Sequence, residues 1–520
     1  MSTDKKIAQN WGLVGLLTFI SRLIGYLRDV VVAYFFGASY QTDAFYVAFR
    51  IPNLLRRLFA EGSITVAFVP IFTEYLNDGY EEAKKALDSI FTVLFFVICI
   101  VSVLGIIFSP LIVKLFAYGF DEKTFNLAVE LNRIMFPYIV FISLAALSMG
   151  ILNTLKHFFA PAFSPALFNL VIIASIAALY NVFDNPIKAL AVGVLIGGVI
   201  QLAINIPFLI KQNFLFRFST NLRHPAVKSL IILVTPQLFG LAVYNFNILV
   251  NTQYASFMPD GTITYLYFSE RLIEFPLGVI AVSIATVMLP KLSAEAANKN
   301  FDVFKKDYLF SLQMMLYILI PSLMGLIALR VPLCTVLFQR GEFTDAAVLN
   351  TAQAVLGYSI GLWAIGGLRI TVPAFYALKD TKTPVMIAFI AFIVNIIFGY
   401  ILGIYFSMHQ LGLAIASSIS ATINFILLFY ILNSRTKQLF AKPFKDFLIR
   451  IIPVALLMGV STWFLARFIK WNDNESFTNF AALAGIILVS FVIYFGITKL
   501  MKIKEADHLI SILRRKEIDT

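Results

Sequence analysis

The chain has 520 residues, of which 60% are hydrophobic and only 13% charged, and its formal net charge is +12. Soluble domains are about half apolar and about one quarter charged, so this composition excludes an ordinary soluble globular enzyme. Apolar stretches of about 20 residues, the length that crosses a ~30 Å hydrocarbon core, recur from one end of the chain to the other. The sequence therefore predicts an all-α polytopic membrane protein.

Fourteen apolar stretches, separated by charged or Pro- and Gly-containing breaks, predict the transmembrane helices. The first carries charges and is followed by no small-residue cleavage motif, so we expect a retained helix and not a removed signal peptide. In chain order the predicted spans cover residues 11–37, 41–76, 88–117, 126–155, 160–181, 187–210, 228–257, 262–290, 309–338, 345–377, 383–406, 409–433, 446–470 and 477–501.

Lysine and arginine collect in the loops that follow even-numbered spans and in both tails, whereas the other loops hold few of them. Because basic loops stay on the cytoplasmic side, this pattern predicts a multi-pass inner-membrane protein with both termini in the cytoplasm. The net charge then reflects membrane topology. We expect no nucleic-acid partner, because no basic groove on a soluble domain is available.

Three landmarks of the first half recur in the second half with nearly constant offset. Residues 63–70 match 283–290, "LFAYGF" matches "LFQRGEF", and Leu155-Lys156 matches Leu378-Lys379. An internal repeat of six spans places both copies in the same orientation and predicts two parallel six-helix lobes around a central cavity. The predicted domains are residues 1–217, residues 218–440, and an additional two-helix hairpin with a basic cytoplasmic tail at 441–520.

Charged residues concentrate in the first, second and eighth predicted helices, although an ionisable group inside a bilayer is costly and is normally functional. At 1.5 Å per residue, Arg22 and Arg271 lie roughly 15 and 14 Å from the surfaces where their helices begin. The predicted substrate-binding residues are Arg22, Arg28, Asp29, Asp43, Arg50, Arg56, Arg57, Glu61, Arg271 and Glu274.

These charges have two interpretations, which the sequence leaves open. They could neutralise one another as structural ion pairs, Arg57 with Glu61 for example. Alternatively, the predominance of arginine over lysine favours a phosphate or pyrophosphate clamp, because the guanidinium fork matches phosphate oxygens bidentately.

Other classes of function fit the sequence less well. A drug or cation antiporter would favour acids and aromatic residues in the cavity, and a membrane-embedded transferase or phosphatase would need paired acids with a metal or a nucleophile with a base. A scaffold with a vestigial cavity is a further alternative. We predict no catalytic residues, no metal ligands, no cofactor and no enzymatic activity.

The motifs "SRLIGYLRD", "PNLLRRLFAEG", "ERLIEFPLGV" and "YALKDTKTP" resemble those of the MurJ (MviN) lipid II flippases, in the multidrug/oligosaccharidyl-lipid/polysaccharide exporter superfamily. The resemblance covers about residues 11–435. It implies a two-lobed fold with a C-terminal helix pair that holds the lipid tail, and export of undecaprenyl-pyrophosphate-linked disaccharide-pentapeptide by alternating access. The family's cavity positions fall on Arg22, Arg28, Asp29, Asp43, Arg56, Glu61 and Arg271.

The resemblance also implies partners and coupling. Lipid II and membrane lipids are the expected partners, together with cell-wall synthesis or division machinery. Some family members bind sodium through acids on the seventh and eleventh helices, where this sequence has Asn245, Asn247 and Asn395. Coupling to a monovalent cation or to the membrane potential therefore stays open, as does a flippase for another polyprenyl-linked oligosaccharide.

Overall fold

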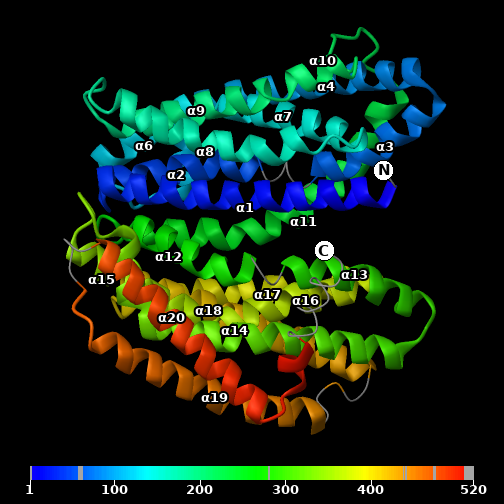
Figure 1. The fold of residues 1–520 in the computed structure, drawn as a ribbon. Helices are drawn as coiled ribbons and strands as arrows, with labels where there is room; N and C mark the ends of the chain where they lie inside the picture. Colours follow the sequence, from blue (N-terminus) through cyan, green and yellow to red (C-terminus); the bar gives the residue numbers. More distant parts are fainter. Residues whose placement is uncertain are drawn as a thin grey trace. The chain divides into compact units, whose positions relative to one another are not determined.

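The computed structural model of the protein describes residues 3–56, 63–278, 282–436, 439, 442–471 and 476–508. All regular elements of these residues are helices (Figure 1). The chain divides into two compact units, Met1–Gly261 and Thr262–Thr520. The all-α prediction is confirmed for the described part of the chain.

The first unit contains eleven helices, several of which are halves of one predicted span. They are α1 (Thr3–Phe36), α2 (Tyr40–Arg56), α3 (Ser63–Asp78), α4 (Tyr80–Ile107), α5 (Ser109–Phe116), α6 (Glu122–Met135), α7 (Tyr138–Thr154), α8 (Phe159–Leu179), α9 (Ile187–Ala203), α10 (Ile206–Lys211) and α11 (Pro225–Ala255).

In the second unit, too, several helices are halves of one predicted span. Its helices are α12 (Thr262–Pro276), α13 (Val282–Ala297), α14 (Phe301–Phe338), α15 (Asp345–Ile360), α16 (Leu362–Ala377), α17 (Lys382–Phe398), the π-helix η3 (Gly399–Tyr405), α18 (His409–Thr436), α19 (Lys442–Arg467) and α20 (Ser476–Leu500).

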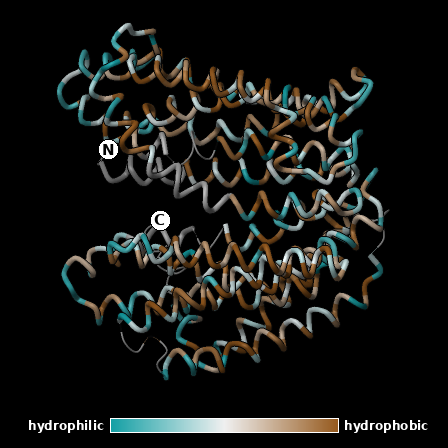
Figure 2. The backbone as a smooth tube through the Cα atoms, turned by 180° about the vertical axis from the view of Figure 1, so that it is seen from behind, coloured by the Kyte–Doolittle hydropathy of each residue, from teal (hydrophilic) through white to brown (hydrophobic). Residues whose placement is uncertain are grey.

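Nine helical segments of the described residues are long and apolar enough to cross a membrane, and the pair α15 and α16, bent by 45° at its junction, makes a tenth if it counts as one span. Figure 2 shows hydrophobic residues along the middle of the long helices and hydrophilic residues toward their ends. The arginine-bearing helices α1, α2 and α12 are not among the nine. The chain is thus a multi-pass membrane protein.

Each of the fourteen predicted spans contains at least one helix, but three of the predicted starts are wrong by eight residues. The helices expected to begin at 11, 88 and 309 begin at Thr3, Tyr80 and Phe301. Lysines that suggested a loop instead lie in the first turns of the helices, where Lys84 pairs with Asp88 four residues later. Such i,i+4 pairs support a helix even where the sequence is polar.

Several backbone features occur at equivalent places of the two halves. Gly37 and Gly261, 224 residues apart, both have positive φ, and so do Lys156 and Lys379, 223 residues apart. The N-caps of α6 and α15 are also 223 residues apart: Asp121 accepts from the Thr124 amide and Thr344 from the Ala347 amide. These correspondences support the repeat. The predicted domain boundaries stay a prediction. The boundary between the two compact units falls after Gly261, since α11 packs on α3, α4 and α5 of the first unit.

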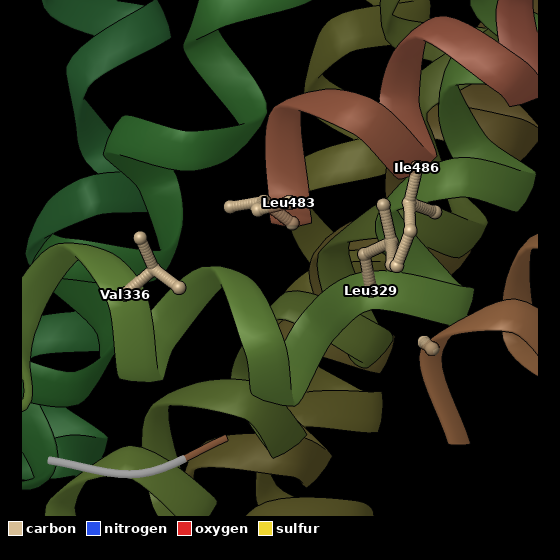
Figure 3. Packing of buried hydrophobic residues seen from close by; sticks show 5 residues of the cluster. Leu329, Val336, Leu483 and Ile486 are labelled. Carbon is tan, nitrogen blue, oxygen red and sulfur yellow. The ribbon is translucent and has the colours of Figure 1, made fainter. Parts of the chain in front are cut away.

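The C-terminal hairpin of α19 and α20 packs on α14. Figure 3 shows Leu329 and Val336 of α14 beside Leu483 and Ile486 of α20, all buried. In a bilayer such contacts stabilise through close packing and interhelical hydrogen bonds, since lipid tails are as apolar as leucine. Tyr494 supplies one such bond, donating to the Tyr317 carbonyl at 2.6 Å.

Candidate functional site

The charged pair of α1 is buried and held from α8. Arg28 donates from Nε and Nη2 to Asp29 Oδ1 at 3.0 and 2.6 Å, and from Nη1 to Asn169 Oδ1 at 3.0 Å. Arg28 is 8% exposed and Asp29 3%. Helix α8 approaches closely at this point, because a Cβ on Gly25 would lie 3.4 Å from the Asn169 amide nitrogen. Removing either charge would leave the other buried and uncompensated, so the pair stabilises the α1–α8 contact.

The carboxylate of Asp43 in α2 binds a backbone amide. Its Oδ2 accepts a 2.7 Å hydrogen bond from the amide of Gly261, and the side chain is almost fully buried. Gly261 has φ 88°, a conformation that L side chains rarely adopt, and it directly precedes α12. The Asp43 carboxylate therefore satisfies the backbone amide of the last residue of the first unit.

The two described arginines of α2 lie within the first unit and are also anchored. Arg50 donates from Nη1 to the hydroxyl of Thr252, a fully buried residue of α11. Arg56 donates from Nε to Asn53 Oδ1, one turn earlier, at 2.8 Å. Both guanidinium groups keep further nitrogens for other partners, since arginine has five donors.

Arg22 differs from the other arginines of α1 and α2, because its side chain is exposed and it has no hydrogen-bond or ion-pair partner in the described part of the chain. An arginine in the middle of a long apolar helix is costly unless water or an anion reaches it. The predicted Arg57 and Glu61 lie outside the described residues, so their proposed ion pair stays a prediction.

Arg271 of α12, in the second unit, rests on an aromatic residue one turn earlier. Its Nη2 donates to the Tyr267 hydroxyl at 2.8 Å, and its guanidinium carbon lies 5.1 Å from the centre of that ring. Glu274 Oε2 lies 3.5 Å from Nη1, and both of these side chains are partly exposed. The neighbouring Glu270 accepts a hydrogen bond from Tyr358 of α15 at 3.0 Å. Arg271 is therefore oriented by Tyr267 and Glu274, while about a third of its side chain, 34%, stays exposed.

The structure thus brings predicted residues together in small sets within each unit: Arg28 with Asp29, and Arg271 with Glu274. Sequence reasoning missed the neutral partners of the predicted arginines, namely Asn169, Thr252, Asn53 and Tyr267. The i−3 and i−4 spacings of Asn53 and Tyr267 from their arginines could have indicated two of them. Asn169 and Thr252 come from helices distant in sequence and carry no local signal.

The second unit contains an apolar cavity of about 740 Å³ between α14, α16, α18 and α19. Leu323, Trp363, Phe425 and Ile452 are among its lining residues, and Asn433 is one of the few polar ones. Such a lining suits a hydrocarbon chain and offers little to a charged group. Within the described residues no group of three or more His, Cys, Asp or Glu could hold a metal ion.

Comparison with known proteins identifies the family. The model of the family "Lipid II flippase MurJ" matches residues 32–481. A "Probable lipid II flippase MurJ" of Vibrio cholerae serotype O1 is 35% identical over 95% of this chain and 96% of its own length. A "Lipid II flippase MurJ" of Burkholderia cenocepacia is 36% identical over 94% of this chain and 96% of its own.

Solved structures agree. A lipid II flippase MurJ in an inward closed conformation has a TM-score of 0.78 and 31% identity, covering 93% of this chain and 98% of that one. An inward-facing multidrug resistance MATE family transporter of the MOP superfamily has a TM-score of 0.67 at 15% identity, covering 81% and 96%, which shows a common fold alone. The chain therefore belongs to the MurJ family of lipid II flippases.

Proposed function

We propose that this chain moves lipid II, the undecaprenyl-pyrophosphate-linked disaccharide-pentapeptide, from the cytoplasmic to the outer leaflet by alternating access. One observation carries the proposal: the family match spans residues 32–481, and relatives named as lipid II flippases align over nearly their whole length. The likeness to MATE transporters supports the fold and gives no separate support to drug antiport.

The physical task of such a protein is to carry a diphosphate and sugars through a layer that cannot solvate them. Unpaired charge in hydrocarbon costs many kcal/mol, whereas guanidinium groups in a wet cavity replace the lost hydration by paired charge. The apolar tail needs no such help and stays in the lipid or in an apolar groove. Binding of the head group by arginine is thus the step that lowers the barrier.

Arg22 and Arg271 are the residues that we propose contact the diphosphate directly. Arg22 is exposed, and Arg271 is 34% exposed with its second face held by Tyr267. Arg28 is already bonded to Asp29 and Asn169, so its contribution is a fixed, oriented pair rather than a free cation. Arg50, Arg56 and Glu274 remain proposed members of the set, as do Arg57 and Glu61.

The cavity between α14, α16, α18 and α19 supports a site for part of the polyprenyl tail. Its volume of about 740 Å³ and its aliphatic and aromatic lining fit several isoprene units, and α19 belongs to the C-terminal hairpin for which the family resemblance implies this role. We propose an inner-membrane location with both termini in the cytoplasm. Cell-wall synthesis or division machinery remains a predicted partner.

The outward direction of export determines how the membrane potential acts on the anionic head group. A membrane potential that is negative inside favours outward movement of an anion by about 2.3 kcal/mol per charge per 100 mV. Coupling to a monovalent cation is the alternative, and Asn245, Asn247 and Asn395 are the residues in question; the side chain of Asn245 lies outside the described part of the structure. Dissipating the potential and the sodium gradient separately would distinguish the two sources.

The test is complementation of bacteria depleted of their own lipid II flippase. Lipid II that reaches the outer leaflet is counted by an externally added enzyme that cleaves exposed head groups. We expect this chain to restore cleavage, and a chain that is inserted at normal levels but restores none would overturn the proposal. Repeating the assay with another polyprenyl-linked oligosaccharide would identify the alternative substrate class.

A further inference from the structure

The connection between α10 and α11, residues 212–224, which we term the strap, is fixed to the first turns of α4. It is the green segment that follows α10 in Figure 1. Four hydrogen bonds hold it: Tyr80 hydroxyl to the Asn213 carbonyl at 2.7 Å, Lys84 Nζ to the Leu215 carbonyl at 2.7 Å, the Arg217 amide to Asp88 Oδ1 at 2.9 Å, and the Ser219 amide to the Thr92 hydroxyl at 2.9 Å.

These bonds have a regular register. The helix partners recur every four residues and the strap partners every two. Four helical residues rise about 6 Å and two extended residues span about 6.6 Å, so an extended segment can follow one face of a helix with every second backbone group bonded. The strap is therefore an extended segment fixed along α4 by regularly spaced hydrogen bonds.

Aromatic side chains at every second position of the strap contact rings of α4, Phe214 that of Tyr80 and both Phe216 and Phe218 that of Phe91. Phe214 is buried, Phe216 stacks on Phe91 of α4 at 4.7 Å between ring centroids, and Phe218 is 64% exposed. The Phe218 ring also lies 6.1 Å from that of Phe96. Phe96 begins the exposed apolar face of α4, which faces lipid in a membrane-spanning helix, so the strap lies where hydrocarbon gives way to head groups.

The charged residues of the strap and its immediate flanks are all basic. Between residues 211 and 228 the sequence has Lys211, Arg217, Arg223 and Lys228 and no acid. All four side chains are exposed, and the described part of the chain offers them no ion-pair partner. The neighbouring acids Glu82 and Asp88 of α4 pair with Lys85 and Lys84.

We propose that the strap binds an anionic phospholipid of the leaflet that meets this end of α4. Phe218 inserts beside Phe96 at the top of the acyl chains, and Arg217 and Arg223 bind the phosphodiester and the anionic head group. Aromatic residues prefer the interface, and arginine pairs with phosphate oxygens. The inference is independent of the flippase function, since it uses none of the residues assigned to the cargo.

The test measures binding of dioleoyl-phosphatidylglycerol and of dioleoyl-phosphatidylcholine to the purified full-length protein in a neutral detergent, by native mass spectrometry. We expect preference for phosphatidylglycerol, and a loss of affinity of about tenfold or more in the Arg217→Gln/Arg223→Gln variant, because each basic residue near a lipid surface contributes attraction. Phe218→Ser should weaken both lipids without changing the charge.

The matched control is Lys299→Gln/Lys306→Gln, which removes two exposed cations from the α13–α14 region. It should leave phosphatidylglycerol affinity unchanged. Equal losses in the two double variants, or no loss in either, would overturn the proposal. Competition by millimolar inorganic phosphate as strong as that by the lipid would also overturn it, because the site would then be a simple anion site.

Discussion

Asp43 and Gly261, 218 residues apart, are joined by a 2.7 Å hydrogen bond from the glycine amide to the carboxylate. Gly261 is the last residue of the first compact unit, and its positive φ lets the chain turn directly into α12. A carboxylate that the sequence assigned to substrate binding therefore has at least one oxygen committed to the backbone. The link joins α2 to the point where the chain enters the second unit.

Replacing Asp43 by leucine removes this acceptor and leaves the Gly261 amide without it. Hydrogen bonds to charged groups contribute about 1.5–3 kcal/mol, so we expect a lower apparent unfolding midpoint in thermal denaturation of the purified protein. Asp43→Asn is the matched variant, because its Oδ1 can still accept; it should lose clearly less. Equal midpoints for the leucine variant and the unaltered protein would contradict the assigned role.

Removing the guanidinium of Arg22 or Arg271 should abolish lipid II export while leaving insertion intact. Loss of a charge-assisted contact to a diphosphate corresponds to roughly 10- to 100-fold in rate. The measurement is head-group cleavage in depleted cells, normalised to the amount of protein in the membrane. Arg133→Ala, which removes an exposed arginine of α6, serves as the control and should export normally. Normal export by either alanine variant would refute the arginine clamp.

Tyr267→Phe should reduce export less than Arg271→Ala does, by about tenfold at most. The ring that packs against the guanidinium remains, and only the hydroxyl that accepts from Nη2 and Nε is lost. Tyr267→Leu removes ring and hydroxyl together and should be the more severe change. The measurement compares the export rates of the two variants, and we expect Tyr267→Phe to be faster than Tyr267→Leu. The reverse order would show that the ring does not orient Arg271.

We expect the stability of the fold to depend on pH through Asp380, in the turn between α16 and α17. Hydrogen bonds from the side chain and backbone of Thr383, and then from Arg435, lower the pKa of Asp380 to about 2. A lowered pKa stabilises the fold above the unfolded value of 3.8, and this contribution is lost as the pH falls from there through about 2.

We therefore expect Asp380→Asn to be less stable at pH 7 by about 1 kcal/mol, a value reduced for the solvent exposure of Arg435. Thermal unfolding of both proteins between pH 7 and pH 3 is the measurement. The difference between them should shrink below pH 4. A difference that stays constant over this range would mean that ionisation of Asp380 contributes nothing.

Gly412→Ala should destabilise the second unit. A Cβ at this position would lie 2.5 Å from the Leu402 carbonyl carbon and 2.7 Å from the Gly403 nitrogen, both backbone atoms of η3. Forcing these segments apart costs about 1–3 kcal/mol, which thermal unfolding can detect. Gly485→Ala is the control, since its Cβ would meet nothing within 4 Å; an equal loss in both would contradict the close contact.

Much of the fold follows from the sequence, because an apolar stretch of membrane-crossing length can satisfy its backbone only as a helix. The breaks within spans were harder to foresee. Proline does not mark these breaks uniformly: Pro110 lies in the first turn of α5 and Pro276 is the last residue of α12, whereas Pro52 lies inside α2 without ending it. Tertiary packing decides such places.

The arginines could likewise be named from the sequence, but their partners could not. Arg28 depends on Asn169, 141 residues away, and Arg50 on Thr252, 202 residues away. Such contacts are set by how helices pack against one another, and a single sequence contains no signal for them. Only Tyr267 and Asn53, within one turn of their arginines, were accessible to local reasoning.

The alternating attachment of the strap constrains which changes in length this connection can accept. Deleting one residue between Asn213 and Ser219 would turn Phe214 and Phe216 away from α4 and bring Leu215 and Arg217 into their places. Deleting two would preserve the pattern and shorten the attachment by one hydrogen bond. Natural relatives that keep this attachment should therefore differ here by even numbers of residues.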